Sequence, residues 1–234
     1  MTITVIIPTF NEERSLPRTL AHTAARGFDN IVVVDGGSTD QTRAVVEVFA
    51  SRFTLHASRL ILLASPPGRA RQMNQGAKES RADVLLFLHA DTELPPNAKQ
   101  VIGQALRDPA CIGGRFDVQF DRSSLLGSAI CTLMNLRSRW SGIATGDQAI
   151  FVRRAIFEQL GGYAEIPLME DVEFTRRLKR AGRVVALYEK VTTSFRRWET
   201  YGPVRTILLM WTLRVFYWLG VSPHQLGRWY GMVR

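Results

Sequence analysis

The sequence predicts an α/β fold in which a mostly parallel central sheet is covered by helices on both faces. Short, nearly continuous apolar runs, which are typical of strands buried on both sides, alternate with longer segments of helical periodicity. Pro, Gly, Ser or Asp residues bound these runs. With 234 residues, 46% of them hydrophobic, the chain can bury one sizeable core, and a single domain is the natural expectation.

Residues 1–110 carry the clearest alternation of the two patterns. The predicted strands are Ile3–Ile7, Asn30–Val34, Arg59–Leu63 and Val84–Leu88. The predicted helices between them are Glu13–Ala25, Asp40–Arg52 and Gly68–Glu79. This order, strand then helix then strand, requires crossover connections and therefore favours parallel strands.

Residues 111–200 follow a different pattern, with fewer buried runs. Residues Gly113–Asp121 alternate like a strand exposed on one face, and Ala149–Val152 form a second expected strand. The expected helices are Ser123–Ser138, Ala155–Leu160 and Glu170–Ala181. Because no repeat or low-complexity linker separates the two parts, residues 1–200 are predicted to be one fold with two halves.

Residues 201–234 form an apolar but interrupted helical segment. Arg214 separates the apolar runs Ile207–Leu213 and Val215–Val221. A spanning helix needs about 20 mostly apolar residues, and a central arginine costs about 2.5 kcal/mol or more, so we do not expect it to span a membrane. Two interpretations stay open: a helix packed on the domain, or an amphipathic helix at a membrane interface with its tryptophans and arginines.

The formal net charge of +9, carried almost entirely by arginine, predicts anionic partners such as phosphates, nucleic acid or an acidic membrane surface. The two cysteines, Cys111 and Cys131, lie in no metal-binding spacing and are expected to be buried thiols. The first apolar run is broken at Pro8, too early for a signal peptide, so we expect a cytoplasmic protein that could also contact the inner face of the membrane.

Polar residues follow each of the first four predicted strands, in the sequences PTFNEE, VDGGSTD, SPPGRARQMNQG and HADTE. Ligands of parallel α/β sheets bind beyond the carboxyl ends of the strands, so these four segments are expected to meet at one ligand site. Asp35, with two glycines after it, could accept the imide N–H of a uracil, and the alternative is a helix cap. Pro8, Thr9, Asn11 and Glu12 could line the other side of the base and ribose, although Glu12 suits a capping role equally well.

Arg69 and Arg71 lie at the start of a predicted helix, where both the arginines and the helix N-terminus favour a phosphate. Asn74 lies one turn further on and could meet a ribose or face solvent. Asp91, at the end of the fourth strand, could hold a divalent cation that bridges a diphosphate, since phosphates and waters complete the shell of such an ion. His89 could point to the sugar or phosphate, or be a second ligand.

Taken together, these residues resemble family 2 glycosyltransferases of the GT-A fold, a Rossmann-like fold of nucleotide-diphospho-sugar transferases. The motifs that carry the resemblance occur in family order over residues 2–182: VIIPTFNEERSLPRTL, IVVVDGGSTDQT, NQGA, LLFLHADTELPPNA, GDQAIFVRRAIFEQLGGY and MEDVEFTRRLKRAG. Within that family, GRARQMNQGA and LHADT resemble a small bacterial subgroup. The resemblance implies a nucleotide-binding half at 1–110 and an acceptor half at 111–200.

The resemblance also implies roles for individual residues. Thr9, Glu12 and Asp35 would hold the uridine of a nucleotide-sugar, and His89-Ala90-Asp91 replaces the Asp-x-Asp motif, which leaves Asp91 as the expected ligand of Mn²⁺ or Mg²⁺. Asp171 would be the general base that deprotonates the acceptor hydroxyl, so that transfer inverts the anomeric carbon; local sequence alone favours a helix N-cap. The remaining residues expected on the acceptor side are Gly146, Asp147, Glu170, Arg197 and Trp198.

The sequence departs from the family pattern at three places. His89 replaces the first aspartate of Asp-x-Asp, Met73 stands where the family often has arginine, and Ser194 replaces the glutamine of the Gln-x-x-Arg-Trp motif of processive synthases. Arg69 or Arg71 could compensate for the missing arginine. Processive polymer synthesis is not expected, because no transmembrane helices are predicted to form a channel.

We therefore expect an inverting, metal-dependent transferase that moves a sugar from a nucleotide-diphosphate donor, UDP-sugar by preference, to an acceptor hydroxyl. A sugar nucleotidyltransferase is the main alternative, but such enzymes usually carry a glycine-rich basic loop where this chain has acidic PTFNEE. A relative that binds the ligand without turnover is the other alternative. A dehydrogenase is disfavoured because no G-x-G-x-x-G follows a strand, and a nucleic-acid partner is not expected because strand-end carboxylates repel phosphate. The acceptor is unknown, and the basic, aromatic C-terminus points to a lipid or hydrophobic one.

Overall fold

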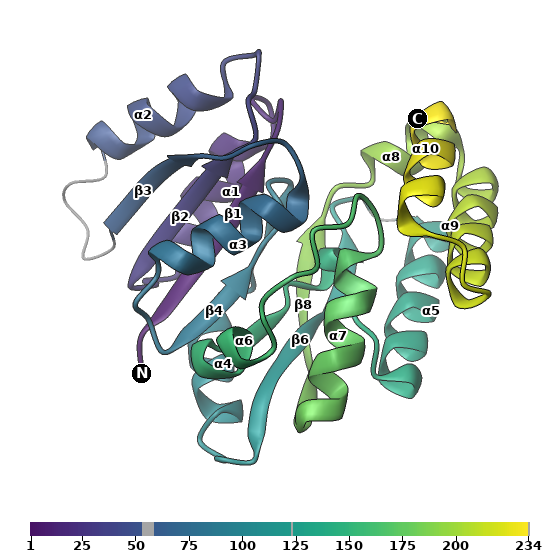
Figure 1. The fold of residues 1–234 in the computed structure, drawn as a ribbon. Helices are drawn as coiled ribbons and strands as arrows, with labels where there is room; N and C mark the ends of the chain where they lie inside the picture. The colour runs from purple at the N-terminus through teal and green to yellow at the C-terminus, as the bar shows by residue number, and fades with distance from the viewer. Residues whose placement is uncertain (53–58, 123, 234) are drawn as a thin grey trace.

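The structure is a computed structural model, and it describes residues 1–52, 59–122 and 124–233. Its centre is an eight-stranded sheet with the strand order β3-β2-β1-β4-β7-β6-β8-β5 (Figure 1). The strands are β1 (Ile3–Thr9), β2 (Asn30–Asp35), β3 (Arg59–Ala64), β4 (Val84–Phe87), β5 (Thr92–Glu93), β6 (Cys111–Phe120), β7 (Phe151–Arg153) and β8 (Arg183–Thr193).

The pairing of the strands confirms the predicted, mostly parallel sheet. Strands β3, β2, β1 and β4 are parallel neighbours, and β6 is parallel to β8. Only β7 and β5 run antiparallel to the strands they pair with. The carboxyl ends of β1, β2 and β4 therefore open at the same edge, where ligands of such sheets bind.

Helices cover both faces of the sheet, as predicted (Figure 1). Side chains of α1 (Leu16–Ala24), α2 (Thr42–Arg52), α4 (Ala98–Ala105) and α5 (Leu125–Ser141) belong to the core on one face. Side chains of α3 (Arg69–Glu79), α6 (Arg154–Gln159) and α7 (Glu170–Ala181) belong to the core on the other. The predicted start of α5 at Ser123 lies outside the described residues.

The strand predicted at Gly113–Asp121 forms as β6, but the expectation that one face is exposed is wrong. Arg115 and Asp117, the polar members of the alternation, are buried. They form an ion pair of 2.6 Å, and Arg139 of α5 pairs with the same aspartate at 2.8 Å. The polar residues that alternate with apolar ones in β6 therefore belong to a buried ion-pair network. The period of the sequence pattern does not reveal whether such polar residues face solvent or a buried partner.

Strand β8 and helix α4 had no counterpart in the sequence prediction. Most positions of β8 are only partly buried, and charged residues interrupt its apolar ones, so it carries no strong strand pattern. Its long parallel pairing with β6 stabilises it instead. Strand β8 therefore forms because it pairs with β6 in the folded protein, and the β-propensity of its own residues is too weak and context-dependent to predict it.

The C-terminal residues form α8 (Arg196–Tyr201), α9 (Pro203–Trp218) and α10 (Pro223–Val233). Leu213 of α9 and Leu226 of α10 are buried against Ile143, Met169 and Val172. Within the described ranges, no helix combines the length and apolarity that crossing a membrane requires. Cys111 and Cys131 are buried free thiols, as predicted.

Candidate active site

A cavity lies between the carboxyl ends of β1 and β4, the start of α3 and the start of α7. Four of the predicted charged or titratable side chains, those of Arg69, His89, Glu170 and Asp171, line it together with buried apolar residues. Its lining residues are Pro8, Arg69, Met73, Phe87, Leu88, His89, Gly146, Ile150, Tyr163, Glu170 and Asp171. The structure thus brings residues from both halves of the chain to one place.

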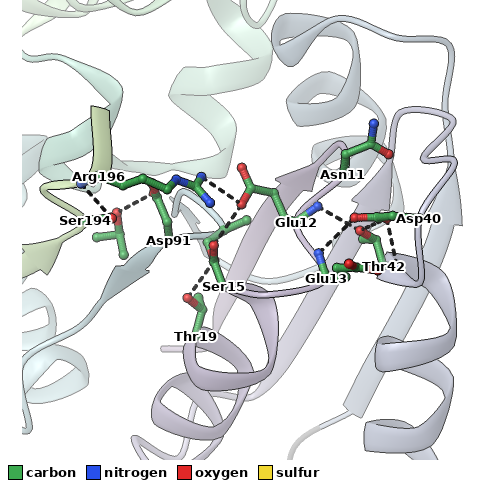
Figure 2. Close-up of polar contacts among 12 residues, drawn as sticks. Asn11, Glu12, Glu13, Ser15, Thr19, Asp40, Thr42, Asp91, Ser194 and Arg196 are labelled. Carbon is green, nitrogen blue, oxygen red and sulfur yellow. Dashed lines mark hydrogen bonds and ion pairs between the residues drawn. The ribbon is translucent and has the colours of Figure 1, made fainter. Parts of the chain in front are cut away.

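The loops after β1 and β2 hold each other through side chain to backbone hydrogen bonds (Figure 2). The Asn11 Oδ1 accepts the N–H of Thr39 at 2.8 Å, and the Glu12 N–H donates to the Thr42 hydroxyl at 2.8 Å. Asn11 has a positive φ of 55°, which asparagine tolerates better than most residues. These bonds give both loops one shape before any ligand binds.

Asp35 ends β2 and is almost fully buried. Its carboxylate accepts the N–H groups of Gly37 at 3.2 Å and of Ser38 at 3.2 Å. A carboxylate has about four lone-pair sites, so these bonds leave capacity for a further donor. Asp35 thus bonds the turn after β2 and does not cap α2, which begins at Thr42, and its contact with a uracil stays a prediction.

Thr9 is also buried, and its hydroxyl donates to the carbonyl of Val34 at 3.3 Å. Gln72 of α3, which sequence reasoning did not select, donates its amide to the carbonyls of Thr9 at 2.7 Å and Val34 at 2.8 Å. It lies directly against Gly36, where an added Cβ would come within 2.9 Å of its side chain. Gln72 therefore joins the ends of β1 and β2, and only its position one turn after Arg69 could have suggested this.

Glu12 faces the segment that follows β8 (Figure 2). Its carboxylate accepts a hydrogen bond from the Ser15 hydroxyl at 3.0 Å and lies 3.5 Å from the guanidinium of Arg196. Figure 2 also shows Asp91 close to Ser194 and Arg196. The segment that replaces the Gln-x-x-Arg-Trp motif therefore lies over the donor-side loops.

Arg69 and Arg71 point in different directions, so the structure does not bring the two predicted phosphate ligands together. Arg69 lines the cavity and lies 3.4 Å from Glu170, whereas Arg71 pairs with exposed Glu165 at 3.1 Å. Positions two apart on a helix are about 200° apart around its axis, which explains the separation. Burial raises the pKa of the Glu170 carboxyl, Arg69 opposes this and Asp171 adds to it.

Asn74 neither faces solvent nor lies free for a ribose. Its amide donates to the carbonyl of Tyr163 at 2.9 Å and accepts the N–H of the same residue at 2.9 Å. Both halves of the amide are thereby used in fixing the loop that follows α6 against α3. Tyr163 is buried and lines the cavity, although the sequence did not suggest it.

His89 connects the end of β4 with the 3₁₀ helix η2 (Gly146–Gln148). Its Nδ1 lies 3.0 Å from the Asp147 carboxylate, and its Nε2 faces Gly146, where an added Cβ would approach to 2.3 Å. Ala90, the next residue, is buried, and its carbonyl accepts the Thr19 hydroxyl at 2.7 Å. His89 therefore contacts the acceptor side of the cavity and not the side of Asp91.

Asp171 is the second residue of α7, so the helix begins before it and Met169 occupies the N-cap position. One carboxylate oxygen accepts the N–H of Gly146 at 2.8 Å, and the other accepts the N–H of Val172 at 2.7 Å. Asp171 is only partly buried and lines the cavity. The N-cap alternative for Asp171 is therefore wrong, although its carboxylate does accept backbone N–H groups, and the side chain still faces the cavity.

Among the described residues, no three His, Cys, Asp or Glu side chains gather into a cluster that could enclose a metal ion. Asp91 supplies one partly exposed carboxylate at the end of β4. A single carboxylate suits Mg²⁺ or Mn²⁺ when phosphate oxygens and waters provide the other ligands. The donor set therefore fits an ion shared with a diphosphate and does not fit an ion held by protein alone.

The side chain of Arg197 lies outside the described residues. Trp198 packs in an aromatic cluster, stacked on Phe195 with an interplanar angle of 7° and lying 5.6 Å from the ring of Phe120. Through this packing, Trp198 holds α8 against the end of β6. It does not bring Trp198 into the cavity.

Comparisons with known proteins agree with this geometry. The profile of Glycosyl transferase family 2 matches residues 4–161. A PGL/p-HBAD biosynthesis glycosyltransferase of Mycobacterium bovis is 31% identical over 205 residues, which are 81% of this chain and 74% of that protein. A probable glycosyltransferase of Bacillus subtilis, YdaM, is 27% identical over 219 residues, 85% of this chain and 51% of that protein.

Two solved structures share the fold at low sequence identity. Staphylococcus aureus TarS in complex with UDP-GlcNAc superposes with a TM-score of 0.63 at 19% identity, over 83% of this chain and 58% of that one. The mannosyltransferase PcManGT of Pyrobaculum calidifontis, in complex with GDP-Man and Mn²⁺, gives a TM-score of 0.64 at 18% identity, over 82% of this chain and 56% of that one.

These two structures are GT-A fold transferases, so the predicted GT-A fold is confirmed. The chain spans about half the length of the Bacillus protein and less than two thirds of both solved chains. Since the profile covers more than half of the sequence and the mycobacterial relative most of it, the chain belongs to glycosyltransferase family 2.

Proposed function

We propose that this protein transfers a sugar from a nucleotide-diphosphate donor to an acceptor hydroxyl, with inversion at the anomeric carbon. The observation that carries the proposal is the cavity in which Asp171, a partly exposed carboxylate, faces Arg69 and the ends of β1 and β4. The donor is proposed to be a UDP-sugar, in agreement with Asp35 at the end of β2 and with the UDP-GlcNAc bound by TarS.

In this mechanism Asp171 accepts the proton of the acceptor hydroxyl as that oxygen attacks the anomeric carbon. The N–H of Gly146 orients one carboxylate oxygen at 2.8 Å, so the base is held by the backbone of η2. Attack opposite to the leaving diphosphate inverts the anomeric carbon. Arg69 lines the same cavity and stabilises the negative charge that develops on the leaving group.

A Mg²⁺ or Mn²⁺ ion held by Asp91 would neutralise part of the diphosphate charge. Arg196 lies above Glu12 and beside Asp91, where it adds a second positive charge to the donor side (Figure 2). His89 binds Asp147 and thereby fixes η2, which carries the N–H that orients Asp171. In this proposal His89 is a positioning residue that holds η2, and through it Asp171, in place.

The test is isothermal titration of UDP into the full chain with and without Mn²⁺. We expect Mn²⁺ to strengthen binding, and Asp91→Ala to remove only the metal-dependent part, because Asp35 and the strand-end loops keep the uridine contacts. Glu93→Ala is a matched control, because that carboxylate follows the same strand end and pairs with Arg18 and His22 instead. Equal metal dependence in the wild type and Asp91→Ala would contradict the metal assignment, and no UDP binding at all would contradict the donor.

We also propose that the C-terminal region contacts an anionic membrane surface. Helix α9 exposes an apolar stripe at Val204, Leu208, Trp211, Val215 and Trp218, with the spacing of a single helix face. Helix α5 exposes a second such stripe at Leu126, Leu133, Leu136 and Trp140. Exposed arginines on α9 and α10 (Arg205 and Arg228) and the net charge of +9 complement anionic lipid.

Deleting the C-terminal helices would uncover Met169 and Val172 beside the site, so point substitutions are the better test. Trp211→Glu and Trp218→Glu place charge on the exposed stripe without disturbing buried Leu213. We expect each to reduce co-sedimentation with vesicles containing phosphatidylglycerol, whereas Tyr188→Glu, an exposed aromatic on β8, should not. Undiminished sedimentation of both tryptophan variants would refute the membrane contact.

A further inference from the structure

Two arginines lie on the side of Asp171 that faces the C-terminal helices, and the mechanism above does not use them. Arg137 belongs to α5 and Arg214 to α9, and both side chains are partly buried. The Nε and Nη2 atoms of Arg137 are enclosed in the protein without a hydrogen-bond acceptor. Among the described residues, neither arginine has an ion pair with a carboxylate within 4 Å.

Two neighbouring arginines of the interior bond carboxylates and carbonyls. Arg139, two residues further along α5, bonds Asp117 and the carbonyls of Ala186 and Leu187. Arg177 of α7 bonds Glu173 and two carbonyls of the loop after α6. Among the described residues, Arg115 also has an enclosed nitrogen without an acceptor, its Nη2, but its Nη1 pairs with Asp117. No such ion pair offsets the charge of Arg137, and leaving a buried charge unpaired is costly.

The two arginines interact electrostatically. Burial, and to a smaller extent Arg214, lower the pKa of Arg137 to about 10, while Asp171 opposes the shift. Burial likewise lowers the pKa of Arg214, and Asp171 and Asp147 oppose it. At neutral pH both groups remain cations, so two positive charges repel each other beside the candidate base.

Packing of the C-terminal helices fixes this arrangement. Leu213, the neighbour of Arg214, is buried in the cluster that contains Ile143, Met169 and Val172. Ile143 precedes η2, and Met169 and Val172 flank the start of α7, so the cluster joins α9 to the two elements that hold Asp171. Arg214 therefore lies beside the elements that hold Asp171, on the side of the C-terminal helices.

We propose that Arg137 and Arg214 together bind a phosphate group of the acceptor, placing the acceptor hydroxyl next to Asp171. This inference rests on the proposed glycosyl transfer and names the class of its acceptor. Each guanidinium group can bind a phosphate dianion through two parallel N–H···O bonds. The two negative charges of the phosphate also offset the repulsion between the two arginines. The carboxylates of Asp171 and Asp147 repel the same anion, so it binds on the arginine side and leaves only the neutral hydroxyl to approach the base.

The test measures inorganic phosphate binding by isothermal titration in the full chain saturated with UDP and Mn²⁺, so that the donor site is already filled. Arg137→Gln and Arg214→Gln should each weaken phosphate binding about tenfold or more, since each removes charged hydrogen bonds. Arg205→Gln, an exposed arginine on the same helix as Arg214, should change it less than about twofold. Equal weakening in all three variants, or in none, would overturn the proposal, as would phosphate binding that UDP abolishes.

A second measurement separates a ligand site from a structural role. Arg137→Met removes an enclosed, unpaired charge, so its melting temperature in phosphate-free buffer should be higher than that of the wild type. Phosphate should raise the melting temperature of the wild type and not that of the variant. A lower melting temperature for Arg137→Met without phosphate would mean that Arg137 stabilises the fold, and the proposal would fail.

The acceptor phosphate could belong to a water-soluble ester or to a lipid headgroup, and vesicles distinguish the two. If the lipid source is correct, vesicles with phosphatidic acid should bind the wild type more tightly than Arg137→Gln, while neutral phosphatidylcholine vesicles should not discriminate. If the soluble source is correct, only inorganic phosphate should show the Arg137 dependence. UDP titration distinguishes a failure of the proposed function from a failure of this inference. If the wild type does not bind UDP, glycosyl transfer from a UDP-sugar is contradicted. If the arginine variants bind UDP normally and also bind phosphate as tightly as the wild type, only this inference is contradicted.

Discussion

The donor-side and acceptor-side regions of the cavity are built in opposite ways. On the proposed donor side, Asn11 and Glu12 bond the loop after β2 and Asp35 bonds the N–H groups of its own loop, so the segments after β1 and β2 are shaped in advance. On the proposed acceptor side, Arg137 and Arg214 carry positive charges that no described carboxylate neutralises within 4 Å. Under the proposed function, the donor side is therefore prebuilt by hydrogen bonds within the protein, whereas the acceptor side keeps charge for its ligand.

The largest expected effect tests the acceptor side. Asp171→Asn should lower sugar transfer by about 10²–10⁴-fold, because asparagine cannot accept the hydroxyl proton. Its amide oxygen can still accept the N–H of Gly146, so the fold and the UDP affinity should stay close to those of the wild type. Transfer is measured as release of UDP from a UDP-sugar, and affinity by titration. Joint loss of transfer and UDP binding would mean that Asp171 is structural.

The next effect tests the prebuilt donor side. Gln72→Ala removes two buried hydrogen bonds between α3 and the ends of β1 and β2, and should lower the free energy of unfolding by about 2 kcal/mol. UDP affinity should fall with it, because the loops lose their shared support. Gln75→Ala, on the exposed side of the same helix, is the control and should stay within about 0.5 kcal/mol in urea unfolding. Similar stability losses in both variants would show that the donor loops do not depend on Gln72.

The smallest effect is a pH dependence at the boundary between the two regions. Burial raises the pKa of Glu170 above its ordinary value of 4.5, so the folded state holds this proton more tightly than the unfolded state. The stabilisation is therefore complete below pH 4.5 and is lost as the pH rises through the folded-state pKa. Glu170→Gln has no such proton to lose. As the pH rises, its free energy of unfolding relative to that of the wild type should therefore increase, by about 1.4 kcal/mol per unit of pKa elevation.

Urea unfolding between pH 4 and pH 8 measures that difference directly. Glu173→Gln, which removes a carboxylate paired with Arg177 on the same helix, is the matched control. If the difference in the free energy of unfolding between Glu170→Gln and the wild type did not change with pH, the pKa of Glu170 would not be raised by folding.

The nucleotide half followed from local sequence more closely than the rest. Strands β1 to β4 and three of its helices were predicted within a few residues, because buried runs and bounding Pro, Gly and Asp residues are local features, whereas the short β5 was not predicted. Helix α4 was missed there, and β8 was missed in the other half. Strand β8 depends on pairing with β6, a partner more than 60 residues earlier, which periodicity within one segment does not reveal.

The predicted site residues divide in the same manner. Among the residues predicted at strand ends, Thr9, Asn11, Glu12, Asp35 and Asp91 lie at the polar edge of the sheet without lining the cavity. His89, which follows β4, and Arg69, at the start of α3, reached the cavity because the connections after parallel strands open at one edge. Asn74, Arg71 and Trp198 did not, since a helix turns its successive residues through about 100° and only tertiary packing decides which of them faces the site. Gln72 and Tyr163 were missed because nothing in their local sequence distinguishes them from ordinary helix and loop residues.

The sequence by itself determined the parallel strands β1 to β4, their polar edge and the family, because strand periodicity, turn residues and ordered motifs are properties of contiguous residues. Only the tertiary structure decided that β8 pairs with β6, that His89 turns to Asp147, that Arg115 is buried, and that Arg137 is enclosed without an acceptor. These residues belong to segments that lie far apart in the sequence, and the energies of their interactions depend on burial and distance, which exist only once the chain has folded.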